Sequence, residues 1–141
     1  MRARMLVLAG GALGTGLRYA SFRIWVHRPG TFPATTLVVN ALGALLLGLF
    51  TGSLRKAVAP ATVSHKTSAP PGSIVAFWRV GVLGGFTTFS AYTVELAEFI
   101  RDGRTTTAAA YATWMTTVGI VAVVAGVALG NRLRVARWAT R

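Results

Sequence analysis

The sequence predicts an all-α membrane protein with four transmembrane helices. Hydrophobic residues make up 53% of the 141 residues and charged residues only 13%, whereas a soluble domain carries about 25% charged residues. Four apolar stretches reach the roughly 20 residues that a membrane-spanning helix needs. The basic residues gather at the ends of these stretches, where they would meet anionic lipid headgroups. We therefore expect a single transmembrane domain over residues 1–141.

The first predicted span covers about residues 5–25. Its basic start and short apolar stretch also resemble a secretory signal peptide, but no A-x-A cleavage site follows, so we favour a membrane helix. Gly10, Gly14 and Arg18 lie at i, i+4 and i+8 and share one face. We expect the glycines to allow close helix packing, and Arg18 either to extend to the headgroups or to serve the function.

The second predicted span covers about residues 34–54. Thr36, Asn40, Ala44 and Gly48 recur every four residues and form one stripe along this helix. A side-chain amide inside an apolar span is costly unless it is hydrogen-bonded. Two interpretations stay open for Asn40. It joins two helices, or it donates hydrogen bonds to a hydrated path, with the Thr36 hydroxyl one turn away.

A connection rich in Pro, Ser, Thr and Ala over about residues 55–73 precedes the third predicted span, at about residues 74–100. We expect this connection to be a flexible, solvated loop. The third span contains the segment GVLGGFTTFS, in which glycines and hydroxyl side chains interrupt the apolar residues. Broken helices at membrane depth occur where the freed backbone lines a cavity or binds a ligand. We therefore predict two half-helices with a break near Gly84 to Thr87.

Several polar and aromatic groups surround this predicted break. Exposed carbonyls there could hold a hard cation, and the helix that restarts after it would present free N–H groups. Phe89 and Tyr92 lie three residues apart on the restarted helix and share a face. Packing is the common reason for such a pair, but the positive edges of aromatic rings also suit an anion. Glu95 lies on the same face as Tyr92 and could point into a vestibule.

The fourth predicted span covers about residues 105–130 and has small residues at Gly119, Ala122, Gly126 and Gly130, a further packing stripe. The charges outside the spans predict the orientation. The side with both termini and the 55–73 connection carries nine basic residues: Arg2, Arg4, Arg55, Lys56, Lys66, Arg132, Arg134, Arg137 and Arg141. The other side carries four: Arg23, Arg28, Arg101 and Arg104. Because basic loops stay cytoplasmic, we expect both termini to lie predominantly inside the cell.

Three segments together resemble the Fluc, or CrcB, family of fluoride channels: GGALGTGLRY in the first span, TLVVNALGALLLG in the second and GGFTTFS in the third. The fourth span fits in position and in its small residues. The resemblance implies a passive channel in the plasma membrane of a prokaryote that lowers cytoplasmic fluoride. It also implies an antiparallel dimer with a structural Na⁺ at its interface, formed with a second copy or with an oppositely oriented paralogue.

The resemblance also assigns candidate site residues. The fluoride path would be lined by polar and aromatic side chains: Thr36, Asn40, Thr88, Phe89, Ser90, Tyr92 and Tyr111. Arg18 and Glu95 would lie in the vestibules, and the carbonyls of Gly84 and Thr87 would hold the Na⁺. Two positions depart from the family pattern. Tyr92 has a hydroxyl where the family often has a bare ring, and Met115 replaces a serine, so the polar track from this subunit is expected to be incomplete.

Two other classes of membrane protein stay open. A small multidrug-type antiporter needs an acidic residue in the membrane interior, but the first span has none and Glu95 lies toward a helix end. A non-transporting accessory subunit would have no use for a broken, hydroxyl-rich span. An enzyme is not expected, because no Ser/His/Asp set, metal cluster or pair of catalytic acids is evident. The chain also has no cysteine, and His27 and His65 are isolated.

Overall fold

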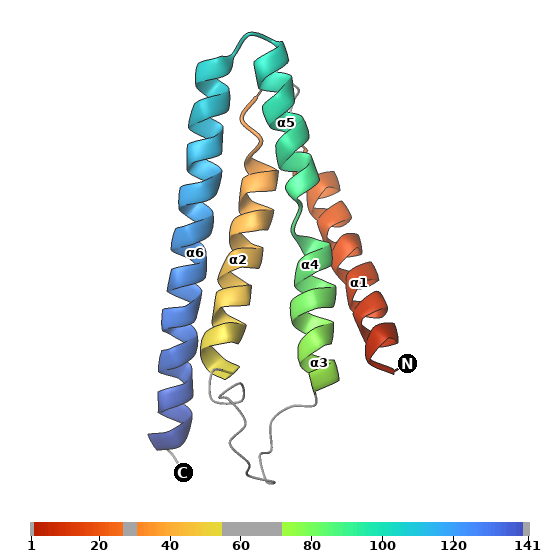
Figure 1. Ribbon diagram of the computed structural model, residues 1–141, viewed down its shortest axis with the longest axis vertical. Coiled ribbons are helices and arrows are strands. Elements are labelled where there is room, and N and C mark those ends of the chain that lie inside the picture. The colour runs from red at the N-terminus through yellow and green to blue at the C-terminus, as the bar shows by residue number, and fades with distance from the viewer. Residues whose placement is uncertain (1, 27–30, 55–71, 140–141) are drawn as a thin grey trace.

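The computed structural model describes residues 2–26, 31–54 and 72–139, and all regular structure in these ranges is helical. The helices, in chain order, are α1 (Arg2–Ile24), α2 (Ala34–Leu54), α3 (Gly72–Ala76), the π-helical segment η2 (Phe77–Val82), α4 (Leu83–Phe86), α5 (Phe89–Arg101) and α6 (Thr105–Ala139). The segments from α3 to α5 follow one another as one long rod (Figure 1). The predicted 55–73 loop lies outside the described residues, except that residues 72 and 73 begin α3.

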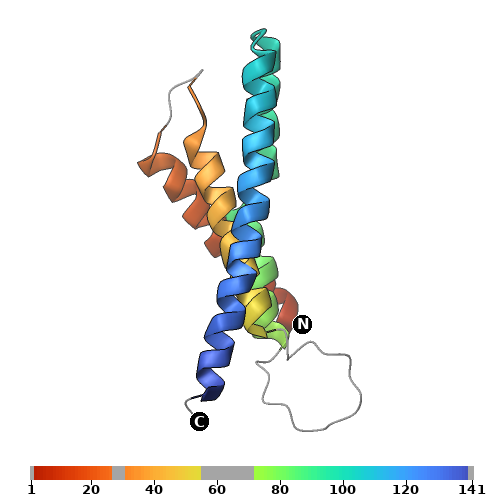
Figure 2. The same ribbon diagram turned by 90° about the vertical axis from the view of Figure 1, so that its left-hand side faces the viewer.

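The four rods, which are α1, α2, the stretch from α3 to α5, and α6, pack in two main pairs. α2 packs chiefly against α6, while α1 packs against η2 and α4 and makes few contacts with α2. α5 then crosses to the other pair and packs against α6. The start of α1 and the end of α6 lie toward the end of the bundle opposite the α5–α6 turn (Figure 1). Figure 2 shows that α1 and α2 diverge from α6 toward that turn.

Close backbone contacts in both pairs depend on glycine. A Cβ on Gly14 would collide with the carbonyl oxygen of Val82, and one on Gly48 would collide with that of Val123. A Cβ on Gly126 would in turn collide with the carbonyl oxygen of Leu45. The predicted packing role is therefore confirmed for these glycines. Gly119 does not pack in this way within the described part of the subunit, because no atom there lies within 4 Å of where its Cβ would be.

Three helical stretches are long and apolar enough to cross a membrane: Ala34–Leu54, Gly72–Arg101 and Thr105–Leu133. The second, third and fourth predicted spans correspond to these stretches. α1 is not among them, although its 23 residues give it a length of about 34 Å at 1.5 Å per residue. Its arginines and glycines make it less apolar than the other three. α6 continues to Ala139, beyond the predicted end at residue 130, because the residues after 130 include several good helix formers.

One cluster of buried apolar side chains lies where α5 meets α6. Phe99, Ala108 and Tyr111 form a buried cluster there, and Tyr111 is fully buried. The turn between the two helices reverses at Gly103, whose φ of +72° is accessible to glycine at little cost. Many other large apolar side chains are exposed, as expected for helices that face lipid.

Candidate functional site

Two residues with extended backbone separate α4 from α5. Thr87 has φ −73° and ψ 157°, and Thr88 has φ −143° and ψ 121°. Thr88 also begins the next helix, because its side-chain oxygen accepts a hydrogen bond from the N–H of Ala91 at 3.1 Å. A threonine in this position is a common helix N-cap, so the sequence itself favours a restart of the helix at Phe89.

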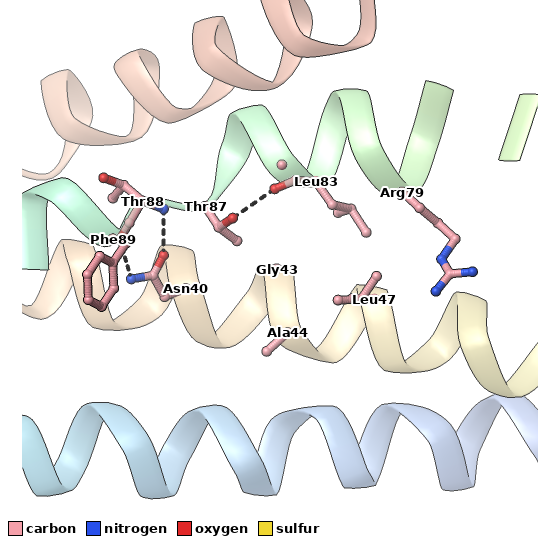
Figure 3. Close-up of a pocket in the computed structure, with 10 residues that line it drawn as sticks. Asn40, Gly43, Ala44, Leu47, Arg79, Leu83, Thr87, Thr88 and Phe89 are labelled. Atoms are coloured by element: carbon pink, nitrogen blue, oxygen red, sulfur yellow. Dashed lines mark hydrogen bonds between the residues drawn. The ribbon is translucent and has the colours of Figure 1, made fainter. Parts of the chain in front are cut away.

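Asn40 of α2 bridges the interruption (Figure 3). Its Nδ2 donates to the carbonyl oxygen of Thr88 at 2.8 Å, and its Oδ1 accepts from the Thr88 N–H, also at 2.8 Å. One side chain thus satisfies both backbone polar groups of a buried residue. A second contact, from Nδ2 to Sδ of Met115, is long at 3.8 Å, and a thioether is a weak acceptor. Asn40 therefore joins two helices and keeps one donor only weakly engaged.

The bond from Thr88 to Asn40 also changes the backbone hydrogen bonding on the α4 side of the interruption. In a continuous helix the Thr88 N–H would donate to the carbonyl of Gly84. Here it donates to Asn40, so the Gly84 carbonyl loses its regular partner. The Thr87 carbonyl instead accepts from Nη1 of Arg18 at 2.9 Å. Arg18, which the family resemblance placed in a vestibule, thus binds the backbone directly at the interruption.

A groove of about 370 Å³ lies beside the interruption. It is lined by residues of α2, η2, α4 and α5: Asn40, Gly43, Ala44, Leu47, Arg79, Leu83, Gly84, Thr87, Thr88 and Phe89. Figure 3 shows the Asn40 amide and the Phe89 ring at one end and the Arg79 side chain at the other. Phe89 is 76% exposed, so its ring is open to the surroundings of the chain. Of the predicted path residues, Asn40, Thr88 and Phe89 line this groove.

Two further predicted path residues, Thr36 and Tyr111, belong to a second, buried cluster around Glu95. Glu95 is only 8% exposed, and Thr36 and Tyr111 are fully buried beside it. Thr36 Oγ1 donates to one carboxylate oxygen of Glu95 at 2.5 Å, and the Tyr111 hydroxyl donates to the other at 2.6 Å. This environment differs from the vestibule that the sequence suggested for Glu95, because both carboxylate oxygens are already hydrogen-bonded inside the protein.

Aromatic rings connect the groove with this cluster. The ring centroids of Phe89 and Tyr92 are 5.7 Å apart, and those of Tyr92 and Tyr111 are 5.4 Å apart. Ser90 lies next to Thr88, and the two hydroxyl oxygens are 3.1 Å apart. The structure therefore brings the predicted path residues into one continuous region from Asn40 to Glu95.

Sequence reasoning left Arg79 without a role. The available signal was a charged residue inside an otherwise apolar span, which is uncommon and often functional. No group of three or more His, Cys, Asp or Glu that could hold a metal ion occurs in residues 2–26, 31–54 and 72–139.

Comparison with known proteins adds independent information. Residues 5–127 match the family described as CrcB-like protein, Camphor Resistance (CrcB). The chain is 37% identical over 136 residues to the fluoride-specific ion channel FluC 2 of Nocardia farcinica, which covers 96% of this chain and 86% of the relative. It is 35% identical over 134 residues to FluC of Hyphomonas neptunium, covering 94% of this chain and 98% of the relative.

A third relative agrees with these two. Fluoride-specific ion channel FluC of Rhizobium meliloti is 38% identical over 126 residues, which cover 89% of this chain and 93% of the relative. The matched region contains the groove, the interruption between α4 and α5, and the buried Glu95 cluster. The chain therefore belongs to the CrcB-like protein family.

Proposed function

We propose that this chain is a subunit of a fluoride-specific ion channel that lets fluoride leave the cell passively. The observation that carries the proposal is the chain's membership of the CrcB-like family. Relatives named fluoride-specific ion channel match it over nearly its whole length. The geometry agrees, because polar groups meet at an interrupted helix inside an apolar protein. Such interruptions occur at membrane depth where the backbone lines a cavity.

The groups in this region suit a small, strongly hydrated anion. A pore must replace the water around fluoride with hydrogen-bond donors or with positive ring edges. We assign these roles to the weakly engaged N–H of Asn40 and to the ring of Phe89, with Thr88 and Ser90 beside them. Tyr92 would continue the path toward the hydroxyls of Thr36 and Tyr111. Neither of those hydroxyls is free while it donates to Glu95.

We also propose that the functional unit is an antiparallel dimer in the plasma membrane. In each subunit α1 would cross the membrane too, in addition to the three stretches named above. Four helices are too few to enclose a pore and still pack together, and the groove is open beside the exposed Phe89 ring. The nine-to-four bias of basic residues favours termini inside. An oppositely oriented paralogue is then one candidate partner, and a second copy of this chain is the other.

The partner is identified by expressing this chain alone with a C-terminal topology reporter. We expect mainly cytoplasmic reporter signal if a paralogue is required. A near-equal split between the two orientations, with fluoride flux from the purified single protein, would contradict the paralogue and identify a homodimer.

A structural Na⁺ at the interruption is a further proposal. The carbonyl of Gly84 fits this role, since its regular helical partner donates to Asn40 instead, and carbonyl oxygens suit a hard cation. Thr87 fits less well, because its carbonyl already accepts from the Arg18 guanidinium. The bound ion would supply positive charge and join the two subunits. Thermal stability of the purified protein should be higher in Na⁺ than in a large organic cation; equal stability would contradict the site.

The channel proposal is tested with purified protein in liposomes loaded with fluoride. We expect fluoride efflux that needs no proton gradient and no drug substrate. Efflux equal to that of protein-free liposomes would contradict a channel formed by this chain alone. Co-expression with a paralogue would then decide whether the second subunit is required.

A further inference from the structure

Arg79 is a cation inside the third membrane span that has no strong partner among the residues the structure describes. It lies in the π-helical segment η2, seven residues after the start of the span at Gly72. Its hydrogen bond within the described part of the chain runs from Nη2 to Thr51 Oγ1 at 3.5 Å, beyond the usual 2.7–3.2 Å. A guanidinium has five N–H donors, so most of those on Arg79 remain available. Charged groups in membrane spans are normally paired or hydrated.

No carboxylate side chain of this subunit is placed to neutralise Arg79. The whole sequence has three acidic residues, Glu95, Glu98 and Asp102. The nearest along the rod, Glu95, is 16 residues away, which corresponds to at least about 24 Å at 1.5 Å per residue. Both of its carboxylate oxygens are already bound by hydroxyls of the buried cluster. The charge of Arg79 is therefore open to a mobile anion.

Arg79 lines the same groove as the proposed path residues. Figure 3 shows its side chain directed toward α2 at the end of the groove opposite Asn40 and Phe89. The Thr51 hydroxyl next to the guanidinium and the Asn40 amide lie eleven residues apart on α2, or about 16 Å along the helix axis. Leu47 and Leu83 line the stretch between these ends. An anion at Arg79 would thus be in the groove but outside the Asn40 and Phe89 site.

The local backbone supports a role beyond packing. η2 is a π-helical turn, and such turns occur frequently at functional sites. Its glycine, Gly81, packs against Gly10 of α1, where an added Cβ would come within 2.9 Å of the Gly10 Cα. The segment is thus anchored to α1 on one side, while Arg79 extends to the groove on the other.

We propose that the Arg79 end of the groove is a second anion site, where the guanidinium binds fluoride before it reaches Asn40 and Phe89. This inference rests on the proposed channel function. A cation at the mouth of a low-dielectric groove raises the local anion concentration and speeds entry of the anion. The weak bond to Thr51 leaves the guanidinium donors available to bind the anion. Arg79 is thereby assigned a binding role on the α3 side of the interruption, since η2 precedes α4 in the rod.

The test uses the full-length protein in neutral-lipid liposomes and measures initial fluoride efflux against fluoride concentration. At low ionic strength, Arg79→Gln should lower efflux about tenfold at limiting fluoride and much less at saturating fluoride. Arg79→Lys should recover most of the loss. The effect should shrink between about 0.01 M and 1 M salt, as the Debye length falls from about 30 Å to about 3 Å. Arg23→Gln, at an exposed position at the end of α1, removes the same charge and should leave efflux unchanged.

A second variant tests the idea without removing Arg79. Thr51→Glu places a carboxylate beside the guanidinium and should reproduce the loss seen with Arg79→Gln, whereas Thr51→Gln should not. Equal efflux for wild type and both charge-altering variants would overturn the proposal. So would a loss of the same size at all fluoride and salt concentrations, or a loss seen only in vesicles with anionic lipid, which would assign Arg79 to a headgroup. If the wild type itself carries no fluoride, the channel proposal fails instead.

Discussion

Replacing Asn40 by alanine tests the central contact of the site. The substitution removes both 2.8 Å hydrogen bonds to Thr88 and leaves the N–H and carbonyl of a residue only 6% exposed without these partners. Side-chain hydrogen bonds between membrane helices contribute about 0.6 kcal/mol on average, while a buried polar group without a partner costs about 1–3 kcal/mol. We therefore expect a destabilisation of about 1–4 kcal/mol, too little to unfold most of the protein.

The effect of Asn40→Ala on transport should be larger than its effect on stability. A hydrogen bond to a charged group contributes about 1.5–3 kcal/mol, and each 1.36 kcal/mol in a barrier changes a rate about tenfold. Loss of the Asn40 donor should thus slow fluoride efflux about 10- to 100-fold. The interruption is also weakened, because the Thr88 N–H becomes free to return to the Gly84 carbonyl.

The assay combines fluoride efflux from liposomes with the temperature of thermal aggregation. Thr113→Val is a matched control, since the Thr113 hydroxyl is exposed and bonds only within α6, to the carbonyl of Ala109 at 2.9 Å. The control should behave like wild type in both measurements. Efflux within twofold of wild type for Asn40→Ala, together with an unchanged aggregation temperature, would refute both roles assigned to this amide.

Three further substitutions have definite expected outcomes. Phe89→Ile, which removes the ring at an exposed position, should slow efflux without lowering the yield of folded protein; unchanged efflux would remove Phe89 from the path. Tyr111→Phe takes one of two hydroxyl donors from Glu95 and should slow efflux severalfold, so normal efflux would mean that this cluster lies off the path. Gly14→Ala should displace α1 and reduce the monodisperse fraction in size-exclusion chromatography, because its Cβ would collide with the Val82 carbonyl. Gly11→Ala, which meets no atom within 4 Å, is the control, and equal profiles would show that α1 does not pack here as described.

The helices were predictable because hydrophobic length alone nearly defines them. The predicted second span, 34–54, coincides with α2 (Ala34–Leu54), and the third lies within the stretch Gly72–Arg101. The end of α6 was not predictable in the same way. A helix that leaves the membrane can continue in water when its residues favour it, so the loss of apolar residues after 130 does not end it. The π-helical turn of η2, which packs against α1, was also missed.

The sequence indicated several of the residues that meet at the interruption, though not Arg79, and it did not indicate their pairings. The polarity of Asn40 within an apolar span indicated either helix joining or a path, and its two bonds to Thr88 show that it joins helices. No spacing rule could have given this partner, because the two residues are 48 positions apart in sequence. The same holds for Glu95, whose partners Thr36 and Tyr111 come from α2 and α6. Periodicity assigns residues to a face, whereas tertiary packing selects what that face meets.

The distribution of charge around the groove favours an anion over a cation as the transported species. Arg79 lines one end of the groove, and Arg18 reaches the backbone at the interruption. The buried acid Glu95 has both oxygens bound by hydroxyls and does not line the groove. A proton-coupled antiporter for cationic drugs needs an acidic group open to its substrate, and Glu95 is not placed to provide one. The one charged residue that lines the groove, Arg79, is therefore a cation, and its field attracts a small anion rather than repelling it.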